Sequence, residues 1–115
     1  MKYMLLICGD ERAMNQSDQV TDRTPEWARY SQELATAGKI RSGERLRPSS
    51  SATTLRANGN GKPLISDGPF AETKEQLGGF YVIEAKDLDE AVGWAGKMPH
   101  LADGGSVEIR PIWDM

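Results

Sequence analysis

Apolar residues along the chain fall into three short runs that are typical of strands. Residues 2–9 are mostly apolar and stop at Gly-Asp, and this length favours a strand over a helix. Residues 78–85 and residues 106–113 predict two further strands. Side chains alternate across a strand, and in the first two of these strands apolar residues occupy both faces. Both faces of these two strands must therefore be covered.

Two other segments have apolar residues at helical spacing. The first follows Thr24-Pro25-Glu26, which predicts an N-cap, a proline at the first helical position and an acidic first turn, and it ends near Ala37. The second begins at Asp87 with Glu90 three residues on, a variant of the capping box, and Pro99 stops it. The predicted buried positions are Trp27, Tyr30, Leu34 and Ala37 in the first helix and Leu88, Ala91, Val92, Ala95 and Met98 in the second.

The middle of the chain has the signals of a hairpin. Residues 52–57 and 62–66 flank the paired Asn-Gly dipeptides at 58–61, which supply the positive φ angles of a tight turn. Residues 67–70 then break the strand, because Pro69 has no N–H for a ladder. The remaining segments are predicted to be a long polar loop at 10–23, a short edge strand at 44–46 and about two helical turns at 71–77.

The order of these elements predicts the architecture. Strand, helix, hairpin region, strand, helix and strand is the order of a ferredoxin-like, split βαβ fold of the α+β class. Residues 1–115 are expected to form one domain, with two helices on one face of an antiparallel sheet. The other face would expose an apolar patch, so we expect a homodimer packed through the sheet.

Composition and charge narrow the classes of partner. The formal net charge is −3 and the basic residues are scattered, so no nucleic-acid partner is expected. The longest apolar run, residues 3–8, is far shorter than the ~20 residues that span a bilayer, so we expect no membrane partner and a cytoplasmic protein. Cys8 is expected to be an inert buried thiol. The sequence has no metal-ligand spacing and no nucleotide-binding glycine motif, so no metal or cofactor is expected.

Residues 67–79 carry the most specific motif of the chain. They read DGPFAETKEQLGG, and they resemble the signature of the DGPF-domain proteins, a branch of the YciI-like group. The resemblance extends to KYMLLICGDE, AGKIRSGERLRP, FYVIEAKDLDEA and GSVEIRPIW. It implies a ferredoxin-like subunit that dimerises as an α/β barrel, with a polar-lined cleft near the signature. It also implies a genomic association with extracytoplasmic-function sigma factors.

Several residues are candidates for chemistry. Asp67 lies at a turn beside glycine and could act as a general base, or it could cap the turn. Glu108 and Arg110 share a strand face, so Arg110 could clamp a carboxylate ligand or form an ion pair between subunits. Further ligand-binding candidates are Phe70, Glu72 and Lys74, the last two of which are also typical of a solvated face, and His100 is expected at the surface.

Two functions remain open at this point. YciI-like relatives are similar to small isomerases and dehydrochlorinases whose active sites use a His and Asp pair. This chain departs from that pattern, because its single histidine, His100, follows the second helix. The first hypothesis is therefore a dimeric small-ligand-binding or accessory protein linked to sigma-factor regulation. The alternative is a lyase or isomerase for an acidic or enolic substrate, with Asp67 as base and Arg110 orienting the substrate.

Overall fold

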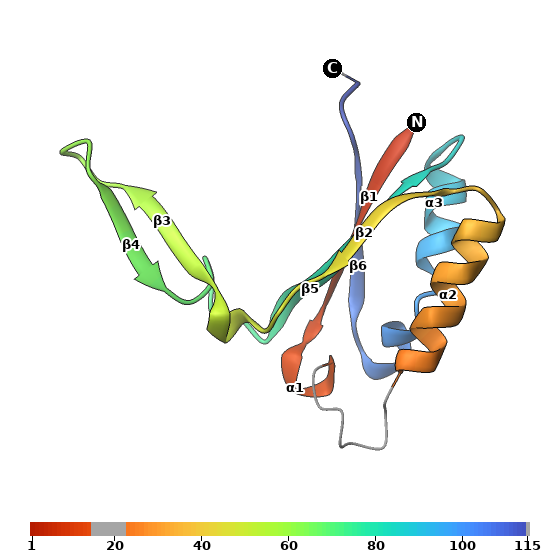
Figure 1. Ribbon diagram of the computed structural model, residues 1–115, viewed down its shortest axis with the longest axis horizontal. Coiled ribbons are helices and arrows are strands. Elements are labelled where there is room, and N and C mark those ends of the chain that lie inside the picture. Colours follow the sequence, from red (N-terminus) through yellow and green to blue (C-terminus); the bar gives the residue numbers. More distant parts are fainter. Residues whose placement is uncertain (15–22, 115) are drawn as a thin grey trace.

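The computed structural model describes residues 1–14 and 23–114. Four antiparallel strands form the main sheet, and two helices cover one of its faces (Figure 1). No helix in these two ranges is long and apolar enough to cross a membrane. The sheet contains β1 (Lys2–Asp10), β2 (Ile40–Arg45), β5 (Glu75–Glu84) and β6 (Ser106–Pro111) in the order β2-β5-β1-β6, and its helices are α2 (Thr24–Thr36) and α3 (Leu88–Ala95). This arrangement confirms the predicted ferredoxin-like α+β fold.

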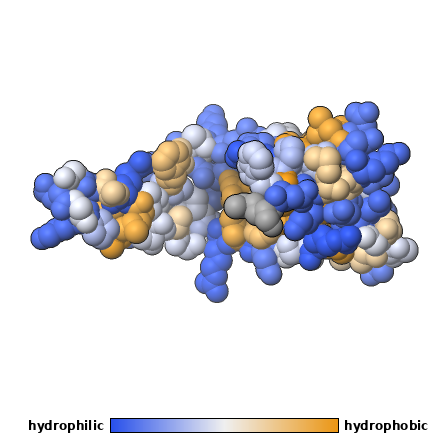
Figure 2. Space-filling view, turned by 90° about the horizontal axis from the view of Figure 1, so that it is seen from above, coloured by the Kyte–Doolittle hydropathy of each residue, from blue (hydrophilic) through white to orange (hydrophobic). Residues whose placement is uncertain are grey.

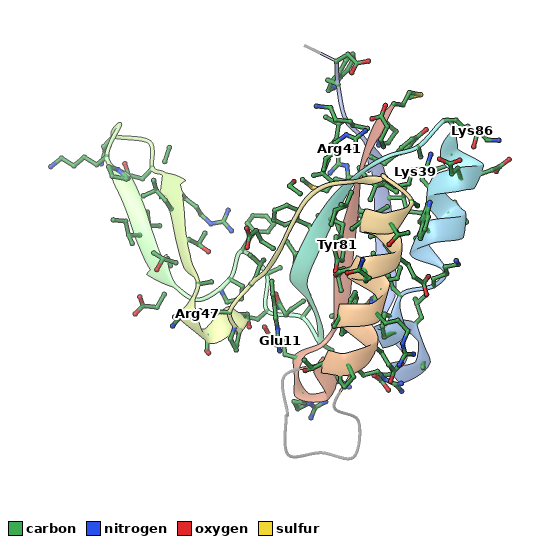
Figure 3. The ribbon with its side chains drawn as sticks, turned by 45° about the vertical axis from the view of Figure 1, so that its right-hand side comes forward. Glu11, Lys39, Arg41, Arg47, Tyr81 and Lys86 are labelled. Atoms are coloured by element: carbon green, nitrogen blue, oxygen red, sulfur yellow. The ribbon has the colours of Figure 1, made fainter. Side chains whose placement is uncertain are left out.

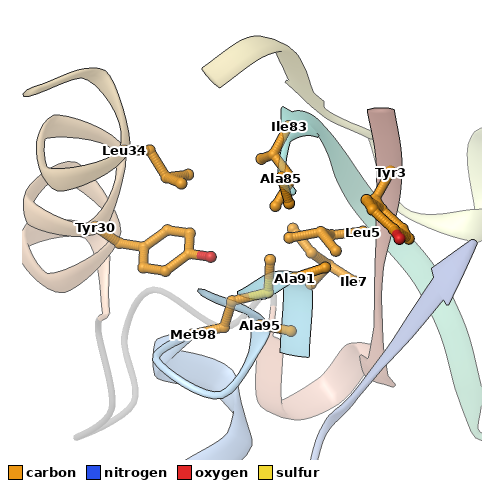
Figure 4. Packing of buried hydrophobic residues seen from close by; sticks show 10 residues of the cluster. All are labelled: Tyr3, Leu5, Ile7, Tyr30, Leu34, Ile83, Ala85, Ala91, Ala95 and Met98. Carbon is orange, nitrogen blue, oxygen red and sulfur yellow. The ribbon is translucent and has the colours of Figure 1, made fainter. Parts of the chain in front are cut away.

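The hydrophobic core lies between the helices and the sheet (Figure 4). Leu5 of β1, Leu34 of α2 and Ile83 of β5 have no solvent exposure, as the alternating pattern of the strands and the helical spacing require. The hydroxyl of Tyr30 donates a 2.7 Å hydrogen bond to the carbonyl oxygen of Trp94, which ties α2 to α3. The rest of the core consists of Tyr3, Ile7, Ala85, Ala91, Ala95 and Met98.

The predicted hairpin is present, but it is not part of the main sheet. Strands β3 (Thr53–Ala57) and β4 (Pro63–Asp67) pair only with each other. They and their connecting loop, residues 53–67, are called the arm below. The arm projects away from the main sheet, on the side opposite to α2 and α3 (Figure 1). Three short helical segments complete the described elements: α1 (Glu11–Met14), η1 (Ser49–Ser51) and η2 (Pro99–Asp103).

The boundaries of several elements differ from the predictions. Residues 71–77 do not form helical turns, because β5 already begins at Glu75 and pairs with the end of β1. The edge strand predicted at 44–46 is longer and begins at Ile40. Helix α2 begins at Thr24, with Arg23 rather than Thr24 in the cap position. The start predicted for α3 is confirmed, since the Asp87 carboxylate accepts a 2.9 Å hydrogen bond from the Glu90 N–H.

The end of α3 and the residues after it correct other expectations. The helix ends at Ala95, well before Pro99, and Leu88 and Val92 are about half exposed rather than buried. Residue Trp113 is 86% exposed, because β6 ends at Pro111. In place of a continuous loop at 10–23, residue 10 belongs to β1 and residues 11–14 form α1, while residues 15–22 lie outside the described residues.

His100 was expected at the surface and is instead buried, with 3% exposure. Its Nε2 lies 2.7 Å from the carbonyl oxygen of Ser106, and its ring stacks on Trp27 with centroids 5.5 Å apart. A carbonyl only accepts, so Nε2 carries the hydrogen. Its Nδ1 has no hydrogen-bond partner among the described residues. No local sequence pattern indicates this burial, because the contacts come from α2 and β6.

Candidate functional site

No described helix covers the face of the main sheet that points away from α2 and α3, and this face is called the open face below (Figure 1). Residues paired across an antiparallel sheet lie on the same face. The pairs Met4–Val82, Leu6–Phe80 and Cys8–Leu77 therefore share the side opposite to the buried Leu5 and Ile83. They form an apolar strip in the middle of the sheet, and its side chains are partly exposed or exposed. The strip contains Met4, Leu6, Cys8, Leu77, Phe80 and Val82.

Polar residues form a rim on both sides of the apolar strip. On edge strand β6, Glu108 is opposite Leu6 and Arg110 is opposite Met4, so both lie on the open face. The two residues thus share one face of their strand, as the sequence predicted. Their charged atoms, Nε and Oε2, lie 3.7 Å apart, and both side chains are more than half exposed. On the other edge, β2 places Ser42 and Glu44 opposite Val82 and Phe80.

One end of the open face is acidic. The Ser106 hydroxyl donates a 2.5 Å hydrogen bond to Oε1 of Glu75. Burial raises the pKa of the nearby Cys8 thiol, and the negative charges of Glu75 and Glu108 raise it further. A thiol with a raised pKa stays protonated at neutral pH and is a poor nucleophile. Cys8 is therefore a poor candidate for a nucleophile, but it is partly exposed on the open face and not buried as the sequence predicted.

The signature residues lie at the base of the arm. Asp67 is the last residue of β4, it is exposed, and it pairs with Thr53. Gly68 follows with φ 102°, a conformation that favours glycine, and its N–H donates to the Ala52 carbonyl at 2.7 Å. The Thr54 hydroxyl donates to the Gly68 carbonyl at 2.8 Å. These bonds close the arm and turn the chain back toward the main sheet.

The rest of the signature runs from the arm to β5. Phe70 is 76% exposed, and the guanidinium of Arg56 lies 4.7 Å from the centre of its ring. Glu72 and Lys74 are exposed. The side-chain amide of Gln76 donates to the carbonyl oxygens of Ala71 and Thr73, at 2.7 and 3.1 Å. Main-chain carbonyls of the bend are thus satisfied by a side chain rather than by a helix.

The candidate residues fall into two groups within one protomer. Glu108 and Arg110 lie together on the rim of the open face. Asp67 lies in the two-stranded sheet of the arm, and Phe70, Glu72 and Lys74 lie in the connection that follows it. Asp67 and Arg110 therefore belong to different sheets, and the protomer alone does not bring the two groups into one site.

One residue that the sequence did not single out fixes the arm to the body. The Glu11 carboxylate accepts hydrogen bonds from both the N–H and the hydroxyl of Ser49, at 2.5 and 2.6 Å. Figure 3 shows Glu11 at the base of the arm, near Arg47. The partners are 38 positions apart, and no local pattern marks such a contact. The bond holds η1, and with it the start of the arm, against the end of β1.

Three comparisons place the chain among known proteins. Residues 1–115 match the YCII-related domain. An uncharacterized protein, R00369 of Rhizobium meliloti (strain 1021), is 36% identical over 115 residues, which cover 97% of this chain and 92% of that protein. The solved structure of 5-chloro-2-hydroxyhydroquinone dehydrochlorinase (TftG) from Burkholderia phenoliruptrix AC1100, in complex with 2,5-dihydroxybenzoquinone, superposes with a TM-score of 0.50 at 20% identity, over 99% of this chain and 94% of that one. At this identity the likeness supports the fold.

Proposed function

Because the chain belongs to the YCII-related domain family, we propose that it works as a homodimer that binds a small acidic organic ligand between two sheets. In this proposal the open faces of two protomers pack together and the protein acts as an accessory protein in the cytoplasm. A link to sigma-factor regulation is part of the proposal and rests on the sequence resemblance in residues 67–79.

The observation that supports the dimer best is the apolar strip of the open face. Phe80, Leu6 and Val82 lie in the two central strands, on the face opposite to α2 and α3, and all three are partly exposed. A contiguous apolar patch is unfavourable in water, and a two-fold dimer is the commonest way to bury one. If the two apolar strips are in contact, the polar rims of one protomer lie opposite those of the other. A cleft lined by these rims would then lie on each side of the apolar contact.

Arg110 supports an acidic ligand in that cleft. Its Nε lies 3.7 Å from Glu108 Oε2, which is longer than a hydrogen bond. The guanidinium therefore keeps donors for a ligand, and its planar fork matches a carboxylate. The neighbouring apolar strip, with Met4 opposite Arg110, offers a surface for the carbon skeleton. An apolar ring with a carboxylate substituent combines both features.

Benzoate and benzamide test the ligand class as a matched pair, because they differ mainly in charge. We expect millimolar benzoate to raise the melting temperature, since a ligand that binds only the folded state stabilises it. Benzamide should have a smaller effect, and Arg110→Gln should abolish the response to benzoate. Lys86→Gln removes one basic charge beside α3, away from the open face, and should leave the response unchanged. Equal shifts with both compounds, or a benzoate shift that survives in Arg110→Gln, would contradict an acidic ligand.

The lyase or isomerase remains the second candidate because of where Asp67 points. Asp67 is two residues from Ile65 in β4, so the two side chains share one face of the arm, and both are exposed. In a dimer this face could approach the rim of a second protomer, where Arg110 lies. Turnover of a small hydroxylated or enolic acid in a substrate screen, abolished by Asp67→Asn and by Arg110→Gln, would support this candidate over simple binding.

A further inference from the structure

The arm has two unlike faces, and one of them is apolar and bare. Cross-strand pairing places Leu55 opposite Ile65 and Ala57 opposite Pro63 on the same face, called the arm face below. Leu55 is 64% exposed and Ile65 is 65% exposed. On the opposite face, Arg56 is paired with Leu64, and its guanidinium lies over the ring of Phe70. Figure 2 shows hydrophobic residues at the surface of the arm.

An arm of this kind is not stable by itself. A two-stranded hairpin is marginally stable in water, and it gains stability by packing an apolar face against another element. All residues of β4 are exposed, and in β3 only Thr54 is partly buried. The body of the protomer therefore does not supply the packing. The structure calls for a partner at the arm face.

The base of the arm determines on which side that partner lies. Glu11 holds Ser49, and the Gly68 N–H is bonded to the Ala52 carbonyl, so both ends of the arm are tied down. The arm leaves the body on the side of the open face, opposite to α2 and α3 (Figure 1). A molecule that covers the open face would thus lie next to the arm. A single partner would therefore lie against the open face and beside the arm.

The charges favour a second copy of the chain as that partner. Residues 45–67, which include the arm and its first connection, contain four basic residues and one acidic residue, Asp67. The open face has the opposite balance. Its acidic side chains are Asp10, Glu44, Glu75, Glu84 and Glu108, against Lys2 and Arg110. Two of these carboxylates already have partners in the protomer, since Asp10 pairs with Arg12 and Glu84 pairs with the N-terminus. In a two-fold dimer, the basic arm of each protomer would meet the acidic rim of the other, and both contacts would form at once.

We propose that each arm packs its apolar face, Leu55, Ala57, Pro63 and Ile65, against the second protomer, so that the two subunits of the homodimer clasp each other and each cleft is completed by the partner's arm. This inference rests on the proposed dimer and deepens it. Asp67, on the same face, would then reach the cleft of the other subunit. The two groups of candidate residues, separate in one chain, would belong to one site built from two chains.

A matched pair of variants tests this inference. Ile65→Asp places a charge on the arm face, whereas Leu64→Asp places the same charge on the opposite face of the same strand, where the wild-type side chain is also exposed. We expect Ile65→Asp to raise the dimer dissociation constant by about tenfold or more, as for a central interface residue. Leu64→Asp should change it much less. Sedimentation velocity over a concentration series measures both, and circular dichroism confirms that each variant is folded.

A photo-cross-linking residue identifies the partner directly. Benzoylphenylalanine at position 65 should give a covalent dimer of this chain on irradiation, and the same residue at position 64 should give much less. If Ile65→Asp and Leu64→Asp dimerise equally well while Leu6→Glu on the open face prevents dimerisation, the arm inference is wrong and the proposed dimer stands. If the wild-type protein is a monomer, both are wrong.

Discussion

At the scale of single residues, a contact between distant parts of the chain sets the position of His100. Its ring stacks on Trp27, 73 positions earlier in the chain. Gly105 permits this arrangement, since a Cβ there would lie 2.3 Å from the His100 ring. The burial of His100 depends on tertiary contacts alone.

Arg23 and Asp103 form another long-range contact of this kind. Two hydrogen bonds of 2.9 Å join the guanidinium to the carboxylate, so the start of α2 is fixed to the end of η2. The hydrogen bonds from Arg23 lower the pKa of Asp103, and partial burial opposes this effect. A carboxyl with a lowered pKa stabilises the fold above its unfolded pKa of about 3.9, and this contribution is lost as the pH falls through its folded pKa.

Asp103→Asn tests the contribution of this ion pair. We expect a lower midpoint of urea unfolding at pH 7, because the amide cannot provide the charge that Arg23 binds. The difference from the wild type should begin to shrink as the pH falls below the unfolded pKa of about 3.9, and it should disappear once the pH passes below the lowered pKa of folded Asp103. Asp114→Asn, in the exposed C-terminal segment, serves as the control and should have little effect. A difference between Asp103→Asn and the wild type that is the same at pH 7 and pH 3 would argue against this role.

At the scale of elements, residues 71–77 show where local propensity fails. The segment has room for about two helical turns, and Ala71, Lys74 and Gln76 are good helix formers. The structure instead pairs residues 75–77 with the end of β1. Ladder hydrogen bonds to a central strand outweigh a propensity of a few tenths of a kcal/mol per residue. The arm was predictable for the opposite reason, because Asn-Gly turns act locally.

Replacing two glycines in different elements with alanine should change the free energy of unfolding in opposite directions. Gly79 in β5 faces the neighbouring strand so closely that a Cβ would lie 2.8 Å from the Glu44 carbonyl oxygen. Gly93 in α3 has open space around its Cα. We expect Gly79→Ala to lower the free energy of unfolding by about 1–3 kcal/mol through overpacking. Gly93→Ala should raise it by about 0.5–1 kcal/mol, because alanine favours a helix.

Urea unfolding of both glycine variants measures these effects. The pair has an internal control, since the same methyl group is added in each case. A Gly79→Ala variant as stable as the wild type would contradict the close approach of β2 and β5. A destabilised Gly93→Ala variant would contradict the placement of Gly93 on the exposed side of α3.

At the scale of the whole molecule, the sequence predicted the architecture but not the position of the arm. Strand order and the cover of two helices follow from the order of elements and from their apolar faces, which the chain itself encodes. The direction of the arm depends on Glu11 and Ser49, and its apolar face has no partner within the described protomer. Likewise, Asp67 and Arg110 lie in different sheets of one chain. The sequence identified both residues as candidates, but it could not show how they would come together in one site.

The central claim is that two copies of the chain cover each other's open face. Sedimentation equilibrium of the wild-type protein at micromolar concentration tests it most directly. We predict a mass of about twice 12.7 kDa, because the apolar strip of Met4, Leu6, Phe80 and Val82 needs a second protomer to cover it. A single species of 12.7 kDa over the whole concentration range would contradict the claim.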